Sequence, residues 1–276
     1  MLVQLLKFRV FLDCTKVDFF RLKTAHIMGK THYVIISGRT VSKLEKAIAE
    51  LKQDGIECEP VSCDVSSRES VMNLVKTASE RGQIQAVIHA AGMSPYMATA
   101  EQLIRTNALG TVLVNQCFSE YMEEGGCIID ISSISAYMVP EFMLPKKVFR
   151  KALTEPLEDF TKTFVRKVNF YPKKIRTGVA YSFSKNFVIW YAKKSALKLG
   201  DKGIRVVSVT PGTFEIPMEK LEGDEVMSFT RNAAIKCAGR AEEIAFLLAS
   251  IADRKCSYLT ATDIVCDGEV VVFRQK

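Results

Sequence analysis

The chain has 276 residues, of which 48% are hydrophobic and 25% charged, a composition typical of a soluble globular protein. Eight scattered cysteines form no CxxC pair, so we predict neither a disulfide framework nor a metal site. The formal net charge of +7 belongs to residues 145–176, which hold ten Lys and Arg against three Asp and Glu, while the rest is neutral. A general affinity for nucleic acid is therefore not expected.

The N-terminal stretch "MLVQLLKFRVFLDC" is apolar but is interrupted by Lys7 and Arg9. It is too short and too charged to span a bilayer, and it lacks a secretory cleavage pattern. No repeat, low-complexity run or Pro/Gly-rich linker divides the chain. We therefore predict a single domain over residues 1–276, without a transmembrane segment, in the cytoplasm.

From residue 33 onward, strand and helix patterns alternate. The β-branched run "YVIIS" predicts a strand at 33–37, and Gly55 is expected to end the helix that follows it. The apolar face of that helix comprises Val41, Leu44, Ile48 and Leu51. A capping box from Ser66 to Glu69 is predicted to begin the next helix.

The alternation continues toward the C-terminus. Further strands are predicted at 58–65, 84–92, 127–132, 203–212 and 262–268, and further helices at 66–82, 107–122, 178–194 and 241–252. Alternating helices and buried strands predict a doubly wound α/β fold around a parallel sheet. Ligands bind such sheets at the carboxyl ends of the strands, so the residues after each strand are candidate site residues.

Those residues form motifs in a recognisable order: "SCDV", "HAAG", "NALGT", "DISSIS", "AYSFSK" and "SVTPGTFEIPM". Together they resemble the motifs of short-chain dehydrogenases/reductases over roughly residues 33–270, with Tyr181 and Lys185 as the YxxxK pair. The resemblance implies a Rossmann-type domain and an oxidoreductase that interconverts a secondary alcohol and a ketone with NAD(P). It also implies a small-molecule substrate and a homodimer or homotetramer.

Four catalytic residues follow from the resemblance. Tyr181 is the implied general acid and base, and Lys185, on the same helix face, would lower the pKa of the phenol and hold the nicotinamide ribose. Ser133 would bond the substrate oxygen, with Ser132 pointing to the opposite face. Asn107 would hold a water molecule in a proton relay, but an ordinary helix cap before "ALGT" is an equally weighted interpretation.

The resemblance also implies the cofactor contacts. His89 stands where the family usually has Asn, and we interpret it as a structural substitute. Gly38 stands where an acidic residue would bond a ribose 2′-hydroxyl, whereas Arg39 can pair with a 2′-phosphate; this favours NADP(H) over NAD(H). Ile216 stands where the family usually has Thr. The implied cofactor-binding residues are Arg39, Asp64, Val65, Ala90, Ala91, Gly92, Tyr181, Lys185, Pro211, Gly212 and Ile216.

Residues 1–32 depart from the family pattern. They contain a single glycine, Gly29, and lack the TGxxxGxG loop whose backbone amides would hold the pyrophosphate at a helix N-terminus. We therefore expect weak dinucleotide binding and a sheet whose central first strand is missing. The alternatives to an intact enzyme are a damaged one, with a frameshifted or misjoined start, and a non-catalytic binding or assembly protein of the same fold.

Residues 138–178 form an insertion, because Ser133 and Tyr181 lie 48 residues apart, much farther than is usual in the family. Apolar residues at steps of three and four predict an amphipathic helix interrupted near Pro156. They are Phe149, Leu153, Leu157, Phe160, Phe164 and Val168. The insertion resembles that of the hydroxysteroid dehydrogenase/carbonyl reductase branch, which caps the substrate cleft and replaces one subunit interface. We interpret it as a lid for a hydrophobic, steroid-like substrate or as a solvated basic flap, with attachment to a membrane surface as a weaker alternative.

Overall fold

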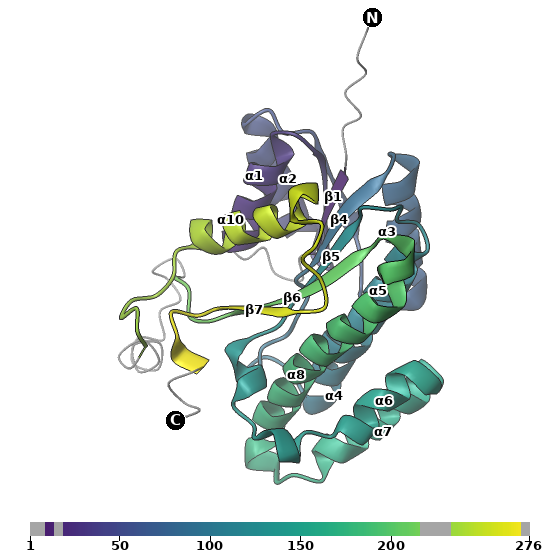
Figure 1. The fold of residues 1–276 in the computed structure, drawn as a ribbon, viewed down its shortest axis with the longest axis vertical. Helices are drawn as coiled ribbons and strands as arrows, with labels where there is room; N and C mark the ends of the chain where they lie inside the picture. The colour runs from purple at the N-terminus through teal and green to yellow at the C-terminus, as the bar shows by residue number, and fades with distance from the viewer. Residues whose placement is uncertain (1–8, 14–18, 216–232, 272–276) are drawn as a thin grey trace, which may run out of the picture.

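The computed structural model describes residues 9–13, 19–215 and 233–271. Within them, seven parallel strands form one sheet in the order β3-β2-β1-β4-β5-β6-β7 (Figure 1). The strands are β1 Arg9–Asp13, β2 Tyr33–Gly38, β3 Cys58–Ser62, β4 Ile84–His89, β5 Cys127–Ile131, β6 Arg205–Pro211 and β7 Asp263–Cys266. The strand order reverses between β1 and β4, which confirms the predicted doubly wound fold and marks where a ligand crevice is expected.

Helices cover both faces of the sheet. On one face, α1 (Phe19–Gly29), α2 (Val41–Gln53) and α10 (Ala241–Ala252) pack into a core with the strands; on the other, α3 (Arg68–Glu80), α5 (Gly110–Ser119) and α8 (Lys173–Leu199) do so (Figure 1). The other helical segments are α4 Ala100–Leu103, η1 Ile104–Leu109, η2 Ile134–Tyr137, η3 Glu141–Met143, α6 Lys146–Thr154, α7 Leu157–Asn169, η4 Gly200–Lys202 and η6 Arg254–Cys256.

The central strand β1 is present, so the expectation that residues 1–32 contribute no first strand is wrong. Its five residues pair in parallel with β2 on one side and with β4 on the other, and Leu12 aligns with both Ile36 and Ile88. Parallel pairing uses main-chain amides and carbonyls, which every residue except proline supplies. A strand can therefore form here although the glycine motif that normally follows it is lacking.

Two local predictions are corrected at helix starts. Val41, the first residue of α2, has 53% of its surface exposed, because the first turn lies at the rim of the sheet; the other three predicted apolar residues of this helix are buried. The cap of α3 is Ser67, whose side chain accepts a hydrogen bond from the amide of Ser70 at 3.3 Å. Ser66 instead donates to the Asp64 carboxylate, which holds the preceding turn.

The insertion is helical and is interrupted where expected. The helix α6 ends at Thr154, and α7 begins at Leu157 directly after Pro156. Four of the six predicted apolar residues are fully buried: Phe149, Phe160, Phe164 and Val168. Leu153 is 50% exposed, contrary to the prediction, because α6 turns the small side chain of Ala152 toward the core instead.

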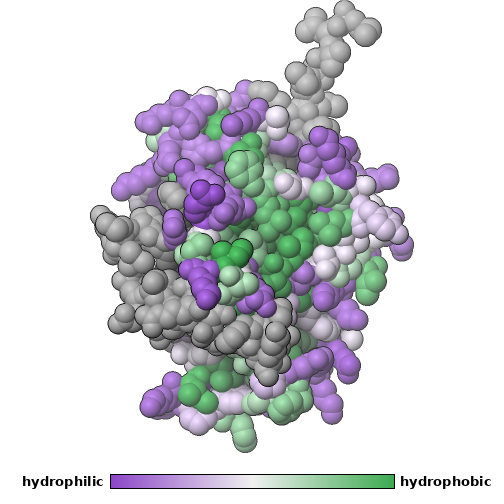
Figure 2. Space-filling view, turned by 60° about the vertical axis from the view of Figure 1, so that its left-hand side comes forward, coloured by the Kyte–Doolittle hydropathy of each residue, from purple (hydrophilic) through white to green (hydrophobic). Residues whose placement is uncertain are grey.

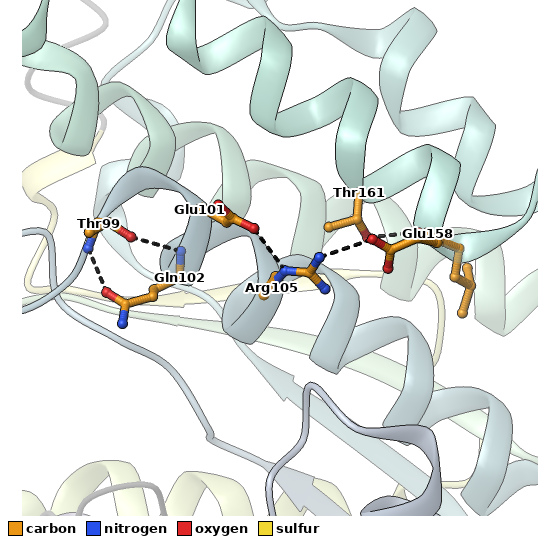
Figure 3. Close-up of polar contacts among 7 residues, drawn as sticks. Thr99, Glu101, Gln102, Arg105, Glu158 and Thr161 are labelled. Carbon is orange, nitrogen blue, oxygen red and sulfur yellow. Dashed lines mark hydrogen bonds and ion pairs between the residues drawn. The ribbon is translucent and has the colours of Figure 1, made fainter.

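The apolar face of α6 and α7 packs against α4, η1 and α8. At its centre Phe187 of α8 contacts Phe149 and Phe160, with ring centroids 5.3 and 5.2 Å apart. Arg105 of η1 ties α7 to α4 by ion pairs with Glu101 and Glu158, at 3.2 and 3.0 Å (Figure 3). The apolar side of these two helices is therefore occupied by packing within the protein, and a role of the insertion as a lid stays a prediction.

Candidate active site

The long helix α8 carries the YxxxK pair. Tyr181 is half-buried and Lys185 is buried, and the Lys185 Nζ atom lies 6.0 Å from the centre of the Tyr181 ring. A spacing of four residues places both side chains on one face of the helix. The structure therefore brings a phenol and an ammonium group into one site, as the sequence predicted.

Lys185 is held at the carboxyl end of β5. Its Nζ atom donates a hydrogen bond to the Ile131 carbonyl at 2.9 Å, and Ser132 Oγ donates to the Lys185 carbonyl at 2.8 Å. The pKa of Lys185 is lowered to about 7, by burial first and by the charge of Arg21 second, while the charge of Asp130 opposes both. Loss of hydration is the main cause, because an ammonium away from water is stabilised only by the few groups around it.

Asn107 lies inside the π-helical segment η1. Its Oδ1 atom accepts a hydrogen bond from the Met93 amide at 2.9 Å, and its Nδ2 atom donates to Ser184 Oγ at 3.1 Å. It is 1% exposed and within a continuous helical run, so its interpretation as a helix cap is wrong. Single π-helical turns inside α-helices are frequent at functional sites.

Gly92 lies beside both Lys185 and Asn107. A Cβ atom built on Gly92 would lie 3.2 Å from Lys185 Nζ and 3.5 Å from Asn107 Oδ1. A Cβ atom here would be in ordinary contact with Asn107 but would require the end of the Lys185 side chain to shift. The "HAAG" backbone therefore approaches the site closely, and Ala90 and Ala91 are each 3% exposed at the end of β4.

The two serines after β5 face different surroundings. Ser132 is buried and faces α8 through its bond to Lys185, whereas Ser133 is half-buried and precedes η2. Ser133 Oγ accepts a weak hydrogen bond from the Ser135 amide at 3.3 Å. The two hydroxyl groups therefore have different protein partners, and a substrate contact of Ser133 stays a prediction.

The predicted adenosine contacts lie at the ends of β2 and β3. Arg39 is exposed directly after β2. The Asp64 carboxylate accepts hydrogen bonds from Ser66 N at 2.9 Å and Ser66 Oγ at 2.7 Å, so one of its oxygens is already used. Val65 is 1% exposed, and a Cβ atom on Gly110 would lie 2.8 Å from its Cγ2 atom.

Pro211 ends β6, and Gly212 follows it directly. The Gly212 amide donates to the Cys266 carbonyl at 2.9 Å, and a Cβ atom at this glycine would lie 2.6 Å from the Asp267 Cα. This glycine is therefore required by the approach of two backbones. Ile216 lies outside the described residues.

Two charged residues near the site were missed from sequence. Arg21, in the first turn of α1, is 6% exposed, and its Nη2 atom donates to the Ala90 carbonyl. Asp130 is fully buried opposite His89 in the β4–β5 register, and it accepts hydrogen bonds from Asn115 at 2.9 and 3.1 Å. Burial raises the pKa of Asp130 to about 6, against the opposing charge of His89. An acidic residue inside the apolar strand "CIIDIS" was a usable signal for Asp130.

Comparisons with known proteins identify the family of this chain. A family model described as short chain dehydrogenase matches residues 22–145, and one described as Enoyl-(Acyl carrier protein) reductase matches residues 161–269. The chain belongs to the short-chain dehydrogenase/reductase family. Its similarity to short-chain dehydrogenase/reductase bsc3 of Alternaria brassicicola is 25% identity over 257 residues, which covers 91% of this chain and 92% of that protein.

Solved structures agree on the fold. A short-chain dehydrogenase/reductase from Serratia marcescens superposes with a TM-score of 0.75 at 18% identity, over 96% of this chain and 98% of that one. A short chain dehydrogenase from Burkholderia cenocepacia in complex with NADP gives a TM-score of 0.73 at 19% identity, over 95% and 97%. Membership of this family supports a generic dehydrogenase or reductase activity and the binding of NAD(P).

The residues at the catalytic end of the site fit a nicotinamide nucleotide. Gly92 provides the space that a Cβ atom would fill, and Lys185 and Asn107 converge beside it. At the phosphate end, residues 14–18 connect β1 to α1 without a glycine, and they lie outside the described residues. The described residues therefore favour a nicotinamide site, whereas the pyrophosphate end departs from the family in sequence.

Proposed function

We propose that this protein is an NADP(H)-dependent oxidoreductase that interconverts a secondary alcohol and a ketone. The observation that carries the proposal is that Lys185 and Asn107 both lie beside Gly92, with the Tyr181 ring centre 6.0 Å from Lys185 Nζ. A structural role alone would not require a tyrosine and a buried lysine to share one helix face beside a close backbone approach. Perturbed and buried titratable groups of this kind concentrate at functional sites.

Each residue has a separate role in the proposed reaction. Tyr181 Oη donates a proton to the carbonyl oxygen during reduction and accepts it during oxidation. The Lys185 ammonium stabilises the phenolate that remains, because opposite charges favour each other at this distance. Ser133 Oγ orients the substrate oxygen, and Asn107 fixes a water molecule in the path by which the proton returns. The bound nicotinamide cofactor supplies or accepts the hydride.

The choice of NADP(H) over NAD(H) rests on the residues after β2. Gly38 offers no carboxylate to a ribose 2′-hydroxyl, and the adjacent Arg39 is exposed and offers a guanidinium to a 2′-phosphate. The Burkholderia cenocepacia protein of the same fold was solved with NADP. Both points support the assignment of Arg39 as the residue that selects the phosphorylated cofactor.

The substrate is proposed only as a small carbonyl or alcohol. The presence of the insertion supports a steroid-like substrate. The aromatic residues of α6 and α7 do not add to that support, because they are buried within the protein. A homo-oligomer and a cytoplasmic location stay predictions. A subunit interface through the part of α8 near Phe187 would have to displace α6 and α7, which cover it.

Replacing Tyr181 with phenylalanine tests the catalytic proposal. Tyr181→Phe should reduce NADPH-dependent ketone reduction by at least about 100-fold, because the proton donor is lost, while NADPH affinity changes little. Tyr121→Phe is the matched control, since Tyr121 is 39% exposed beyond the end of α5. Loss of NADPH absorbance with a panel of ketones gives the activity. A Tyr181→Phe activity within a few-fold of the parent would remove Tyr181 from its role.

The second candidate is a non-catalytic protein of the same fold. The observation that favours it is the absence of any glycine among residues 1–28. Because β1 and α1 are both present, only the connection at residues 14–18 needs to be exchanged for a family-like glycine loop. If NADPH fluorescence titration shows micromolar binding only after that exchange, the parent chain is not a working enzyme. Micromolar binding by the parent chain would exclude this candidate.

A further inference from the structure

The turn between α7 and α8 presents cations and apolar side chains together. Residues 166–176 read "RKVNFYPKKIR" and contain no acidic residue. Four of the cations, Arg166, Lys167, Lys173 and Lys174, are exposed, and no ion pair involves them within the part of the chain that the structure describes. We call residues 166–176 the basic turn.

Two apolar side chains of the basic turn point into solvent. Phe170 is 89% exposed and Ile175 is 50% exposed, whereas the neighbouring Val168 is fully buried. Covering a phenylalanine or isoleucine side chain is worth about 1.5–3 kcal/mol each. Their exposure between four cations is therefore unfavourable unless another surface covers them.

The basic turn is held in this shape by its own contacts. Arg176 donates to the Tyr171 carbonyl from both Nε and Nη2, at 3.1 and 3.0 Å, and from Nη2 to the Asn169 carbonyl at 3.0 Å. Tyr171 packs inward on Phe183, with ring centroids 5.8 Å apart. Because Val168 and Tyr171 face the core, Phe170 between them faces outward. The outward orientation of Phe170 is thus fixed by packing and needs no rearrangement on binding.

The position of the basic turn suits contact with an extended surface. It joins α7 to α8 at the lower end of the molecule, away from α1 and α2 (Figure 1). At this end of the molecule the surface shows apolar groups scattered among hydrophilic ones (Figure 2). Protruding aromatic groups flanked by Lys and Arg match the headgroup region of an anionic bilayer, which accepts both.

We propose that the basic turn docks this protein on an anionic lipid surface, with Phe170 and Ile175 inserted among the headgroups and the four cations above them. Each cation near such a surface adds roughly fivefold to binding, and the apolar side chains add a contribution that is insensitive to salt. A folded acidic protein would attract the same cations but would require complementary cavities for Phe170. This inference is independent of the proposed reaction, since it involves neither the catalytic residues nor the cofactor.

The experiment is cosedimentation of the full chain with phosphatidylcholine vesicles that contain or lack phosphatidylserine. We expect binding only to the anionic vesicles. Phe170→Ser should weaken it about tenfold, and the triple change Lys167→Gln, Lys173→Gln and Lys174→Gln should weaken it about 100-fold. Circular dichroism of each variant verifies that it is folded.

The matched controls lie on α2 and α10, away from the basic turn. Lys43, Lys46 and Lys52 of α2 are exposed, and Phe246 of α10 is 62% exposed. Their replacement by Gln and Ser should leave vesicle binding unchanged. The proposal is overturned if anionic vesicles do not sediment the parent protein, if the α2 controls lose as much binding as the basic turn, or if Phe170→Ser has no effect. If Phe170→Ser has no effect on vesicle binding, and the parent and this variant are retained equally on polyglutamate, an acidic protein partner is indicated instead.

Discussion

The buried ammonium of Lys185 gives a quantitative prediction about stability. Its pKa falls from 10.5 to about 7 in the folded protein, with burial as the first cause and Arg21 as the second. Below about pH 7 both folded and unfolded chains carry the proton, and the loss of hydration destabilises the fold fully. Between about 7 and 10.5 the unfolded chain binds a proton that the folded chain does not, so stability rises with pH across that window.

Lys185→Met removes the titrating group and keeps a long apolar side chain in its place. Integrating the proton linkage from pH 7 to 8.5 gives a rise of about 1.6 kcal/mol in the free energy of unfolding of the parent relative to the variant. Without Lys185 the pKa of Asp130 rises further, because the ammonium lowers it in the parent. Asp130 then destabilises the variant as pH rises, which changes the difference in the same direction.

Urea-induced unfolding at several pH values measures this difference. The single tryptophan, Trp190, is a suitable probe because it packs against Phe149 and Phe187, each with ring centroids 5.8 Å away. Shared groups whose pKa the substitution leaves unchanged cancel when the two curves are subtracted, and Asp130 changes the difference in the same direction as Lys185. The lost hydrogen bond from Lys185 to Ile131 offsets the variant's curve by a constant and does not alter its slope. Parallel pH dependences for the two proteins would refute a desolvated ammonium at this position.

Two further changes test the cofactor assignment and the packing of the insertion. Arg39→Ala should weaken NADPH binding more than NADH binding, by about 1–3 kcal/mol, because a charge-assisted hydrogen bond to the 2′-phosphate is lost. Fluorescence titration of both cofactors measures this difference, and equal weakening of the two would contradict the assignment. Phe187→Ala should lower the free energy of unfolding by about 3–5 kcal/mol through the cavity left among Phe149, Phe160 and Phe164. Phe246→Ala, at a 62% exposed position, is the control and should change it by less than about 0.5 kcal/mol; equal losses would show that the insertion does not depend on this aromatic cluster.

Much of the fold could be predicted from the sequence because hydrophobic periodicity is a local property. The run "YVIIS" became β2, and the break at Pro156 separates α6 from α7. The proximity of Tyr181 and Lys185 also followed directly, since a spacing of four residues fixes a shared helix face. The central strand β1 was not predicted, because the expectation relied on a loop motif, whereas the strand depends only on main-chain pairing.

The sequence by itself determined that this chain forms a doubly wound sheet with a tyrosine and a lysine on one helix near its carboxyl edge. Only the tertiary structure placed Arg21 at the Ala90 carbonyl and brought Asp130 and Asn107 close to the lysine. It also decided that the apolar stripe of α6 and α7 packs on α8 rather than facing a substrate. The physical reason is that periodicity defines which side of an element is apolar, whereas the surface that covers it, and the charges that surround a buried ammonium, come from residues distant in the chain.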